Sequence, residues 1–331
     1  MERLKIFVTR NIQDEGLDML RATADVEVWM EELPPSKPIL MEKVKGVQGI
    51  VSLLTDPIDA EVIDAAGPGL KVISQYAVGT DNIDLFYATE RGIRVGYTPG
   101  VLTETTADLA WTLLMAAARR VVEADAYTRA GKWKTWGPRV LLGQDVSGAT
   151  LGIIGMGRIG MAVARRAKGF GMKIIYYDEH RKNSIEEETG ARYATLEEVY
   201  SQSDFISLHC PLTPETRGLI DDQAFSQMKP TAILINTARG PIVDQDALYR
   251  ALATGKIWAA GIDVAVAEPL PMDSPLLTLD RLVITPHIAS ASFQTRTRMA
   301  VIAAENCLAG LKGEPLPFCA NPEVERRDPS G

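Results

Sequence analysis

The stretch Leu151-Gly-Ile-Ile-Gly-Met-Gly-Arg-Ile-Gly160 joins an apolar strand pattern to three glycines with Gly-x-Gly-x-x-Gly spacing. Gly155 allows a tight turn, Gly157 lets the backbone approach a pyrophosphate, and Gly160 lets a helix pack closely on the strand. A helix that begins here directs free N–H groups and the positive end of its dipole at phosphates. The stretch therefore predicts a strand, a turn and a helix that bind a dinucleotide.

A carboxylate follows this stretch at the distance that ribose recognition requires. Asp178 stands eighteen residues after Gly160, at the end of a second apolar segment, Lys173–Tyr177, where it can accept both ribose hydroxyls. We expect NAD(H) to be preferred because this acid repels the 2′-phosphate of NADP(H). Arg181 is close enough to accommodate that phosphate if the loop bends. A glycine-rich turn without a ligand is the alternative, and it leaves Asp178 unexplained.

Composition narrows the class of protein. The 331 residues are 46% hydrophobic and 24% charged, an ordinary globular composition with enough length for two domains. The net charge of −8 and the absence of a basic stripe disfavour nucleic acid as a partner. We expect a cytoplasmic protein without a membrane span, because no signal-peptide pattern and no apolar run near ~18 residues is present. The three scattered cysteines predict neither a disulfide framework nor a metal site.

Strand-like and helix-like segments alternate along the chain, which predicts an α/β fold with parallel sheets. The first series of strands is expected at Lys5–Thr9, Val26–Trp29, Gly49–Leu54, Lys71–Gln75 and Arg94–Tyr97. The second series is expected at Thr150–Ile154, Lys173–Tyr177, Phe205–His209, Ala232–Asn236, Ala259–Val264 and Leu282–Thr285. We expect two Rossmann-like, doubly wound domains with the active site in the cleft between them.

Two helices determine the expected domain boundaries. A long helix is predicted from about Glu104 to Ala130, and a last helix from Phe293 to Lys312. The second sheet is complete before the last helix begins, so this helix is expected to return to the first domain. The predicted domains are a discontinuous, flavodoxin-like substrate-binding domain, residues 1–98 plus 290–331, and an NAD(P)-binding Rossmann domain, residues 99–289.

Three chemically matched side chains follow strands of the second series. His287 follows the sixth strand, in Ile-Thr-Pro-His-Ile-Ala-Ser, and can exchange a proton near neutral pH. Arg239 follows the fourth strand, and its planar guanidinium suits a substrate carboxylate. Glu268 follows the fifth strand and would stabilise an imidazolium held against it. Taken singly, each also has a structural explanation: a surface or capping histidine, a salt bridge across a turn, and a capping carboxylate.

Together these groups predict hydride transfer between a nicotinamide and a small 2-oxo acid. Arg239 would hold the carboxylate and polarise the carbonyl, and His287 would deliver a proton to the developing alkoxide. Asp263, at the end of the fifth strand, is expected to contact the nicotinamide amide or to cap the loop. His180 lies in a charged loop, and His209 is expected to be packed or near the cofactor rather than catalytic.

These stretches resemble the D-isomer-specific 2-hydroxyacid dehydrogenase family. The matching segments are Gly155–Gly160 with Asp178, Leu208–Leu212, Asn236–Gly240, Gly261–Val264 with Glu268-Pro269, Thr285–Ile288, and Tyr76–Asp84 in the first half. The resemblance implies that Arg239, Glu268 and His287 are the catalytic residues. It implies further substrate contacts, in addition to Arg239 and His287, from Leu53 and from the N–H groups of Val78 and Gly79.

The resemblance also implies the cofactor contacts and a homodimer. The cofactor contacts are expected from Thr106, Gly155, Gly157, Arg158, Ile159, Gly160, Asp178, Cys210, Pro211, Thr216, Thr237, Ala238, Asp263, His287 and Ala289. In relatives the long helix and the arm after it form the dimer interface, which corresponds to residues 104–146 here. Trp133 and Trp136 lie in this arm and would either pack in the interface or reach the partner's substrate.

Within the family, Ser74–Gly79 and Gly131–Pro138 are most similar to the glyoxylate/hydroxypyruvate reductases. D-lactate, D-3-phosphoglycerate and phosphite dehydrogenases remain alternatives of the same class. An NAD(H)-sensing, corepressor-like binding protein is the alternative of another class. One departure from the family pattern is Ala265, where an aromatic residue is frequent, and it predicts looser packing beside the pocket.

Overall fold

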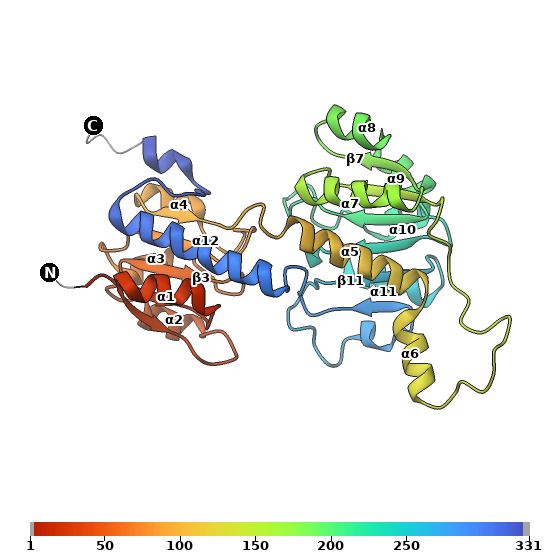
Figure 1. Ribbon diagram of the computed structural model, residues 1–331, viewed down its shortest axis with the longest axis horizontal. Helices are drawn as coiled ribbons and strands as arrows, with labels where there is room; N and C mark the ends of the chain where they lie inside the picture. Colours follow the sequence, from red (N-terminus) through yellow and green to blue (C-terminus); the bar gives the residue numbers. More distant parts are fainter. Residues whose placement is uncertain (1–2, 327–331) are drawn as a thin grey trace. The chain divides into compact units, whose positions relative to one another are not determined.

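The computed structural model describes residues 3–326, and the chain forms two compact units (Figure 1). One unit holds the chain up to Leu102 and again from Ala291, and the other is Thr103–Ser290. The chain thus crosses between units after Leu102 and Ser290, whereas the sequence placed these crossings after residues 98 and 289. No helix among the described residues is long and apolar enough to cross a membrane.

The first unit contains a five-stranded parallel sheet with the order β2-β1-β3-β4-β5. Its strands are β1 (Lys5–Val8), β2 (Asp25–Val28), β3 (Gly49–Ser52), β4 (Val72–Gln75) and β5 (Arg94–Gly96). Each strand lies within two residues of its predicted bounds. The strand order reverses between β1 and β3, and ligands of open α/β sheets bind beyond the carboxyl ends of strands at such a reversal.

Helices cover both faces of this sheet. One face packs against α1 (Asp14–Thr23) and α12 (Phe293–Lys312), and the other against α2 (Lys37–Lys43), α3 (Ala60–Ala66) and α4 (Leu85–Glu90). The bounds of α12 are those that the sequence predicts. Gly16 lets α1 approach α12 closely, because a Cβ there would lie 2.6 Å from the Ala300 carbonyl oxygen. The sequence missed α4, which spans six residues and is too short for its apolar period to show.

The second unit contains a seven-stranded parallel sheet with the order β12-β11-β10-β9-β6-β7-β8. Its strands are β6 (Thr150–Ile154), β7 (Lys173–Tyr177), β8 (Arg192–Tyr193), β9 (Phe205–Leu208), β10 (Ile233–Asn236), β11 (Ala259–Ile262) and β12 (Leu282–Ile284). The sequence predicted six of them and missed β8, whose two residues form no recognisable apolar run. The order reverses between β6 and β9, beside the glycine turn.

Six helices pack on this second sheet. On one face lie α5 (Thr103–Ala118), α7 (Arg158–Gly169) and α8 (Asn183–Thr189). On the other lie α9 (Leu196–Gln202), α10 (Asp222–Gln227) and α11 (Gln245–Ala253). Figure 1 shows α5 and α7 running side by side over the sheet.

The long helix predicted from Glu104 to Ala130 is wrong, because the chain forms two helices there. After α5 ends at Ala118, Arg120 takes a left-handed conformation with φ +53°, and α6 (Val121–Arg129) begins in a new direction. The Arg120 guanidinium donates two hydrogen bonds to Glu123, at 2.8 and 2.6 Å, and one to the Leu142 carbonyl. The break contains neither glycine nor proline, so the sequence carried no local signal for it.

Candidate active site

The glycine turn after β6 has the shape that a pyrophosphate requires. Gly155 has φ +92°, and a Cβ there would lie 2.4 Å from the Cys210 nitrogen, so the end of β9 packs directly against the turn. A Cβ at Gly160 would lie 2.2 Å from the Gly155 carbonyl oxygen. A Cβ at Gly157 would meet no atom within 4 Å, which leaves open space at the start of α7. The first N–H groups of α7 lack carbonyl partners within the helix and can bind an anion.

Asp178 joins the end of β7 to this turn. Its Oδ2 accepts a hydrogen bond from Met156 N at 2.7 Å, and its Oδ1 accepts one from His180 N at 3.0 Å. A carboxylate has about four lone-pair positions, so acceptor capacity remains for ribose hydroxyls. The residues present therefore fit a dinucleotide, with the α7 N-terminus for the pyrophosphate and Asp178 for a ribose.

A second turn, after β10, carries Arg239. The Asn236 side chain holds it by donating to the Arg239 carbonyl at 2.9 Å and accepting from Ala238 N at 3.0 Å. A Cβ at Gly240 would lie 2.0 Å from the Ala265 carbonyl carbon, so the turn lies against the loop after β11. Among residues 3–326 the buried Thr237 Oγ1 has no hydrogen-bond partner, which suits its predicted cofactor contact. The sequence did not reveal the role of Asn236.

His287 and Glu268 form a direct pair, with 2.7 Å between Nδ1 and Oε2. The other carboxylate oxygen of Glu268 accepts from Ala265 N at 3.0 Å, which fixes the carboxylate on the loop after β11. His287 follows β12 with φ +54°, and its N–H donates to the Asp263 carbonyl at 2.9 Å. Because Glu268 occupies Nδ1, Nε2 is the ring nitrogen left for proton exchange with a substrate.

The charges around Glu268 keep it ionised. Burial by itself raises the pKa of Glu268, but the hydrogen bond and charge of His287, the Ala265 N–H and the charge of Arg239 outweigh burial. The pKa of Glu268 therefore lies below its usual value, and the group is a carboxylate at neutral pH. An anion held in this way stabilises the protonated form of a neighbouring imidazole.

Asp263 anchors the loop that carries His287. One oxygen accepts from Thr285 Oγ1 at 2.6 Å and Ile288 N at 2.8 Å, and the other accepts from Ala289 N at 2.8 Å. Burial raises the pKa of Asp263, although these three donors oppose the effect. The sequence assigned Asp263 to the nicotinamide amide or to capping of the loop, but it did not identify these donors, which lie more than twenty residues away. The nicotinamide contact stays a prediction.

The segment after β9 borders the glycine turn. His209 Nε2 lies 2.8 Å from Ser207 Oγ, and burial lowers the pKa of His209 to about 3, so the ring is neutral at neutral pH. Burial raises the pKa of Cys210 to about 11, which leaves a thiol rather than a thiolate. Thr216 Oγ1 donates to the Pro211 carbonyl at 2.6 Å and closes the loop. A neutral His209 cannot act as the proton donor.

The candidate substrate residues of the first unit follow β3 and β4. Leu53 comes directly after β3, and its carbonyl accepts from Asn82 Nδ2 at 3.0 Å. Val78 and Gly79 lie in the loop after β4. Within the described part of the chain, neither of their N–H groups donates a hydrogen bond, which suits the predicted contact with a substrate carboxylate.

A buried relay of side chains fixes these two loops. Ser52 Oγ donates to Gln75 Oε1 at 2.7 Å, and Gln75 Nε2 donates to Asn82 Oδ1 at 2.6 Å. Gln75 Nε2 also lies 3.2 Å from the Gly79 carbonyl oxygen. The polar residues Ser52 and Gln75 at the ends of otherwise apolar strands were the available sequence signal for this relay, and the sequence interpretation did not use it.

The remaining candidate residues lie on elements already described. Thr106 is buried near the start of α5, and Arg158 and Ile159 open α7. Ala238 is in the turn that Asn236 holds, and Ala289 binds Asp263 through its N–H. No group of three or more potential metal ligands occurs among residues 3–326.

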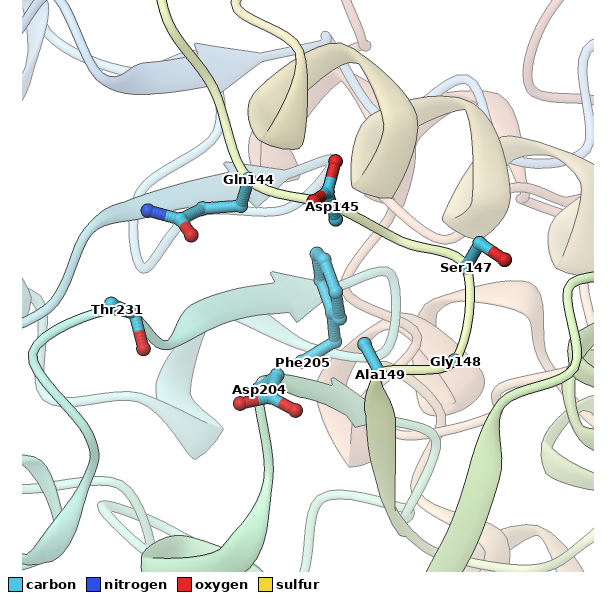
Figure 2. Close-up of a pocket in the computed structure, with 8 residues that line it drawn as sticks. All are labelled: Gln144, Asp145, Ser147, Gly148, Ala149, Asp204, Phe205 and Thr231. Carbon is cyan, nitrogen blue, oxygen red and sulfur yellow. The ribbon is translucent and has the colours of Figure 1, made fainter.

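A polar hollow of about 280 Å³ lies at the opposite edge of the second sheet (Figure 2). Ala149 and Asp204, which border it, directly precede β6 and β9, whereas the candidate residues follow their strands. The Asp204 carboxylate is already engaged by Thr150 N at 2.9 Å and Lys229 Nζ at 2.7 Å. The hollow therefore lies away from the candidate active site.

Comparison with known proteins decides the family. Residues 111–289 match the sequence model of the D-isomer specific 2-hydroxyacid dehydrogenase, NAD binding domain. A glyoxylate reductase of Korarchaeum cryptofilum is 56% identical over 328 residues, which cover 99% of this chain and 98% of the relative. The chain belongs to the D-isomer-specific 2-hydroxyacid dehydrogenase family. The family predicted from the motifs is thus confirmed, and with it an NAD(P)-dependent dehydrogenase.

Solved structures confirm the fold class of this dehydrogenase. A protein of Thermus thermophilus is 49% identical and superimposes with a TM-score of 0.91, over 96% of this chain and 100% of that one. An NADPH-dependent glyoxylate/hydroxypyruvate reductase of Sinorhizobium meliloti, solved with NADP and malonate, is 31% identical with a TM-score of 0.86. That match covers 96% of this chain and 97% of the other. NAD(H) fits the family's domain and Asp178, and the Sinorhizobium complex shows that the fold also accepts NADP.

Proposed function

We propose that this dehydrogenase reduces small 2-oxo acids, with glyoxylate giving glycolate and hydroxypyruvate giving the D-2-hydroxy acid glycerate. The observation that carries the proposal is the 2.7 Å pair of His287 and Glu268, with the charge of Arg239 close enough to lower the pKa of that carboxylate. A proton donor, its stabilising anion and a carboxylate-binding cation thus occur together at strand ends. The names of the similar reductases supply the substrate class.

In the proposed reaction each residue has one task. Arg239 binds the substrate carboxylate and polarises the carbonyl. Leu53 and the N–H groups of Val78 and Gly79 are proposed as further substrate contacts. Bound NAD(P)H supplies the hydride to the carbonyl carbon. The His287 imidazolium donates its Nε2 proton to the carbonyl oxygen, and Glu268 stabilises the charged ring before that transfer.

The proposed cofactor contacts come from the second unit. Backbone N–H groups at the start of α7, with Gly157, would hold the pyrophosphate, and Asp178 would hold the adenosine ribose. The remaining proposed contacts are Thr106, Gly155, Gly160, Cys210, Pro211, Thr216, Thr237, Ala238, Asp263, His287 and Ala289. The Asp263 contact would come from lone pairs that its three loop hydrogen bonds leave over.

A substrate panel tests the proposal. Glyoxylate, hydroxypyruvate and pyruvate are reduced with NADH and NADPH, and phosphite is oxidised with NAD⁺. The configuration of the glycerate and lactate products is determined by chiral chromatography. We expect kcat/KM for glyoxylate and hydroxypyruvate to exceed that for pyruvate about 10-fold. The three acids carry a hydrogen, a hydroxymethyl or a methyl group on the carbonyl carbon, and such a difference changes binding by ~1–3 kcal/mol. Best turnover of pyruvate or phosphite would contradict the substrate proposal. Tight NADH binding without turnover would favour a dinucleotide-sensing role.

We also propose a homodimer that forms through residues 104–146. No residue of α6 is buried, and the arm that follows contains Trp133 and Trp136 with exposed fractions of 65% and 82%. Val121 and Val122 are also more than half exposed. We propose that these exposed apolar side chains, which gather on one segment of the chain, form the protein contact.

Sedimentation equilibrium checks the dimer. The wild-type chain is expected at twice its chain mass, and the double variant Trp133→Glu/Trp136→Glu at a mass closer to one chain. Phe86→Glu places the same charge on an apolar side chain that is 77% exposed outside the arm, and this control should stay dimeric. A monomeric wild type, or a tryptophan variant as dimeric as the control, would show that this interface is wrong.

A cytoplasmic location is proposed as well. Within residues 3–326, no disulfide joins Cys210, Cys307 or Cys319, which suits a reducing compartment. Subcellular fractionation of the source cells would test the location.

A further inference from the structure

The loop after Asp178 holds an arginine in a fixed position. Arg181 donates two hydrogen bonds to the Glu186 carboxylate, from Nε to Oε1 at 2.9 Å and from Nη2 to Oε2 at 2.7 Å. Two parallel bonds to one carboxylate fix the direction of the guanidinium as well as its place. The Arg181 side chain is 63% exposed, whereas that of Glu186 is only 16% exposed. The acceptor is thus the more constrained partner of the pair.

A buried tyrosine anchors that acceptor. Tyr176, in β7, is completely buried, and its hydroxyl donates to Glu186 Oε1 at 2.8 Å while accepting from Lys182 N at 2.7 Å. The hydrogen bonds from Arg181 and Tyr176 hold the pKa of Glu186 below its usual value. Glu186 is therefore an ionised carboxylate tied to the sheet, and it competes with any other anion for Arg181.

The anion with which Glu186 would compete for Arg181 is the 2′-phosphate of NADP(H). In dinucleotide domains the acid after the second strand binds the ribose 2′-hydroxyl, and a nearby arginine accommodates a 2′-phosphate. Arg181 is three residues after Asp178 and is such an arginine, but its fork is occupied by Glu186. Lys182 is also engaged, with its Nζ 3.6 Å from Asp178 Oδ1.

We propose that Glu186 sets cofactor preference by withholding Arg181 from a 2′-phosphate. A 2′-phosphate that binds the Nε–Nη2 edge of Arg181 must displace the Glu186 carboxylate from that edge, whereas binding of NAD(H) need not disturb the pair. Asp178 repels the 2′-phosphate directly. Glu186 weakens NADP(H) binding in a second way, which can be measured separately from the effect of Asp178. The Arg181 side chain is exposed, so solvent screens its attraction to Glu186. We therefore expect the Glu186 carboxylate to weaken NADPH binding by about 3–10-fold.

The test measures cofactor binding without any oxo acid, so its outcome does not depend on the proposed substrate. NADH and NADPH are titrated into the whole protein, and binding is followed by calorimetry. Glu186→Gln removes the charge and keeps an amide that can bind the Tyr176 hydroxyl. The Kd for NADPH is expected to fall about 3–10-fold, and the Kd for NADH to change less than about 2-fold.

The same helix provides a matched control. Glu188 lies two residues further along α8 and pairs with Arg165 instead, with 2.7 Å between Nε and Oε1. Glu188→Gln makes the same change in net charge, and it should alter neither Kd more than about 2-fold. Equal gains from both variants would mean a general effect of charge and would overturn the proposal.

A double-mutant cycle assigns the gain to Arg181. In Arg181→Ala the substitution Glu186→Gln should no longer tighten NADPH binding, because no guanidinium remains to be released. A gain that survives in this background would overturn the proposal, and so would an unchanged NADPH Kd in Glu186→Gln. Thermal unfolding midpoints confirm that each variant is folded. If Glu186→Gln is unfolded, Glu186→Ala takes its place in the cycle.

Discussion

His287→Ala is expected to lower kcat for glyoxylate reduction by about 10²–10⁴-fold, the usual loss when a general acid is removed. The imidazole follows β12 and is paired with the Glu268 carboxylate, whereas burial lowers the pKa of His209 to about 3 and disfavours its imidazolium form. Glu268 holds Nδ1 of His287, so the loss of Nε2 is expected to lower the rate. The measurement is steady-state kinetics at saturating NADH and glyoxylate.

Cofactor binding and a second histidine provide the controls for this variant. The loop at His287 is fixed through the backbone, by Asp263, so alanine should leave the NADH Kd within about 2-fold of wild type. His180→Ala should retain wild-type kcat, because His180 contacts Asp178 only through its backbone N–H. A kcat for His287→Ala within about 3-fold of wild type would remove His287 from the mechanism.

The parts of the fold predicted correctly from the sequence were those with strong local signals. The strands β6 and β7 have the predicted bounds because each is a buried apolar run that ends at a glycine turn or an acid. The helix α12 was also located correctly, since an apolar face that runs along a helix of twenty residues gives a long periodic signal. The helix α4 and the strand β8 were missed because their six and two residues are too few to show a hydrophobic period.

Backbone conformations outside the glycine and proline patterns were not predictable. Arg120 ends one helix and starts the next in a left-handed conformation that its bonds to Glu123 and Leu142 stabilise. His287 shares this conformation, which its neighbours impose on it. Such conformations depend on partners brought near by the fold, so a local pattern cannot reveal them.

The candidate site divides in the same way. Residues that could carry the chemistry, such as Arg239 and His287, could be proposed from the sequence because their side chains are suited to it and they follow strands. The contacts that position them could not be identified in advance, because the partners are either backbone groups or distant in sequence. Asn236 binds two backbone groups of its own turn, and Asp263 binds a loop more than twenty residues away.

Arg239→Ala is expected to lower kcat/KM for glyoxylate by about 10³-fold or more, with losses in both kcat and substrate affinity. One group both binds the carboxylate and polarises the carbonyl, and removal of a single donor to a developing oxyanion typically costs about 10²–10³-fold in kcat. Arg239→Lys restores the charge without the planar fork and should stay at least about 10-fold below wild type. The turn itself should persist, because Asn236 holds it through backbone atoms.

The control for this variant is Arg250→Ala, which removes an exposed guanidinium paired with Asp222 on the outer surface of the same unit. It should leave kcat/KM within about 2-fold of wild type, since exposed pairs contribute little. NADH affinity measured without substrate separates the two possible roles of Arg239. A raised NADH Kd with normal turnover at saturating cofactor would show that Arg239 serves the dinucleotide, because a carboxylate-binding arginine must instead affect the oxo acid.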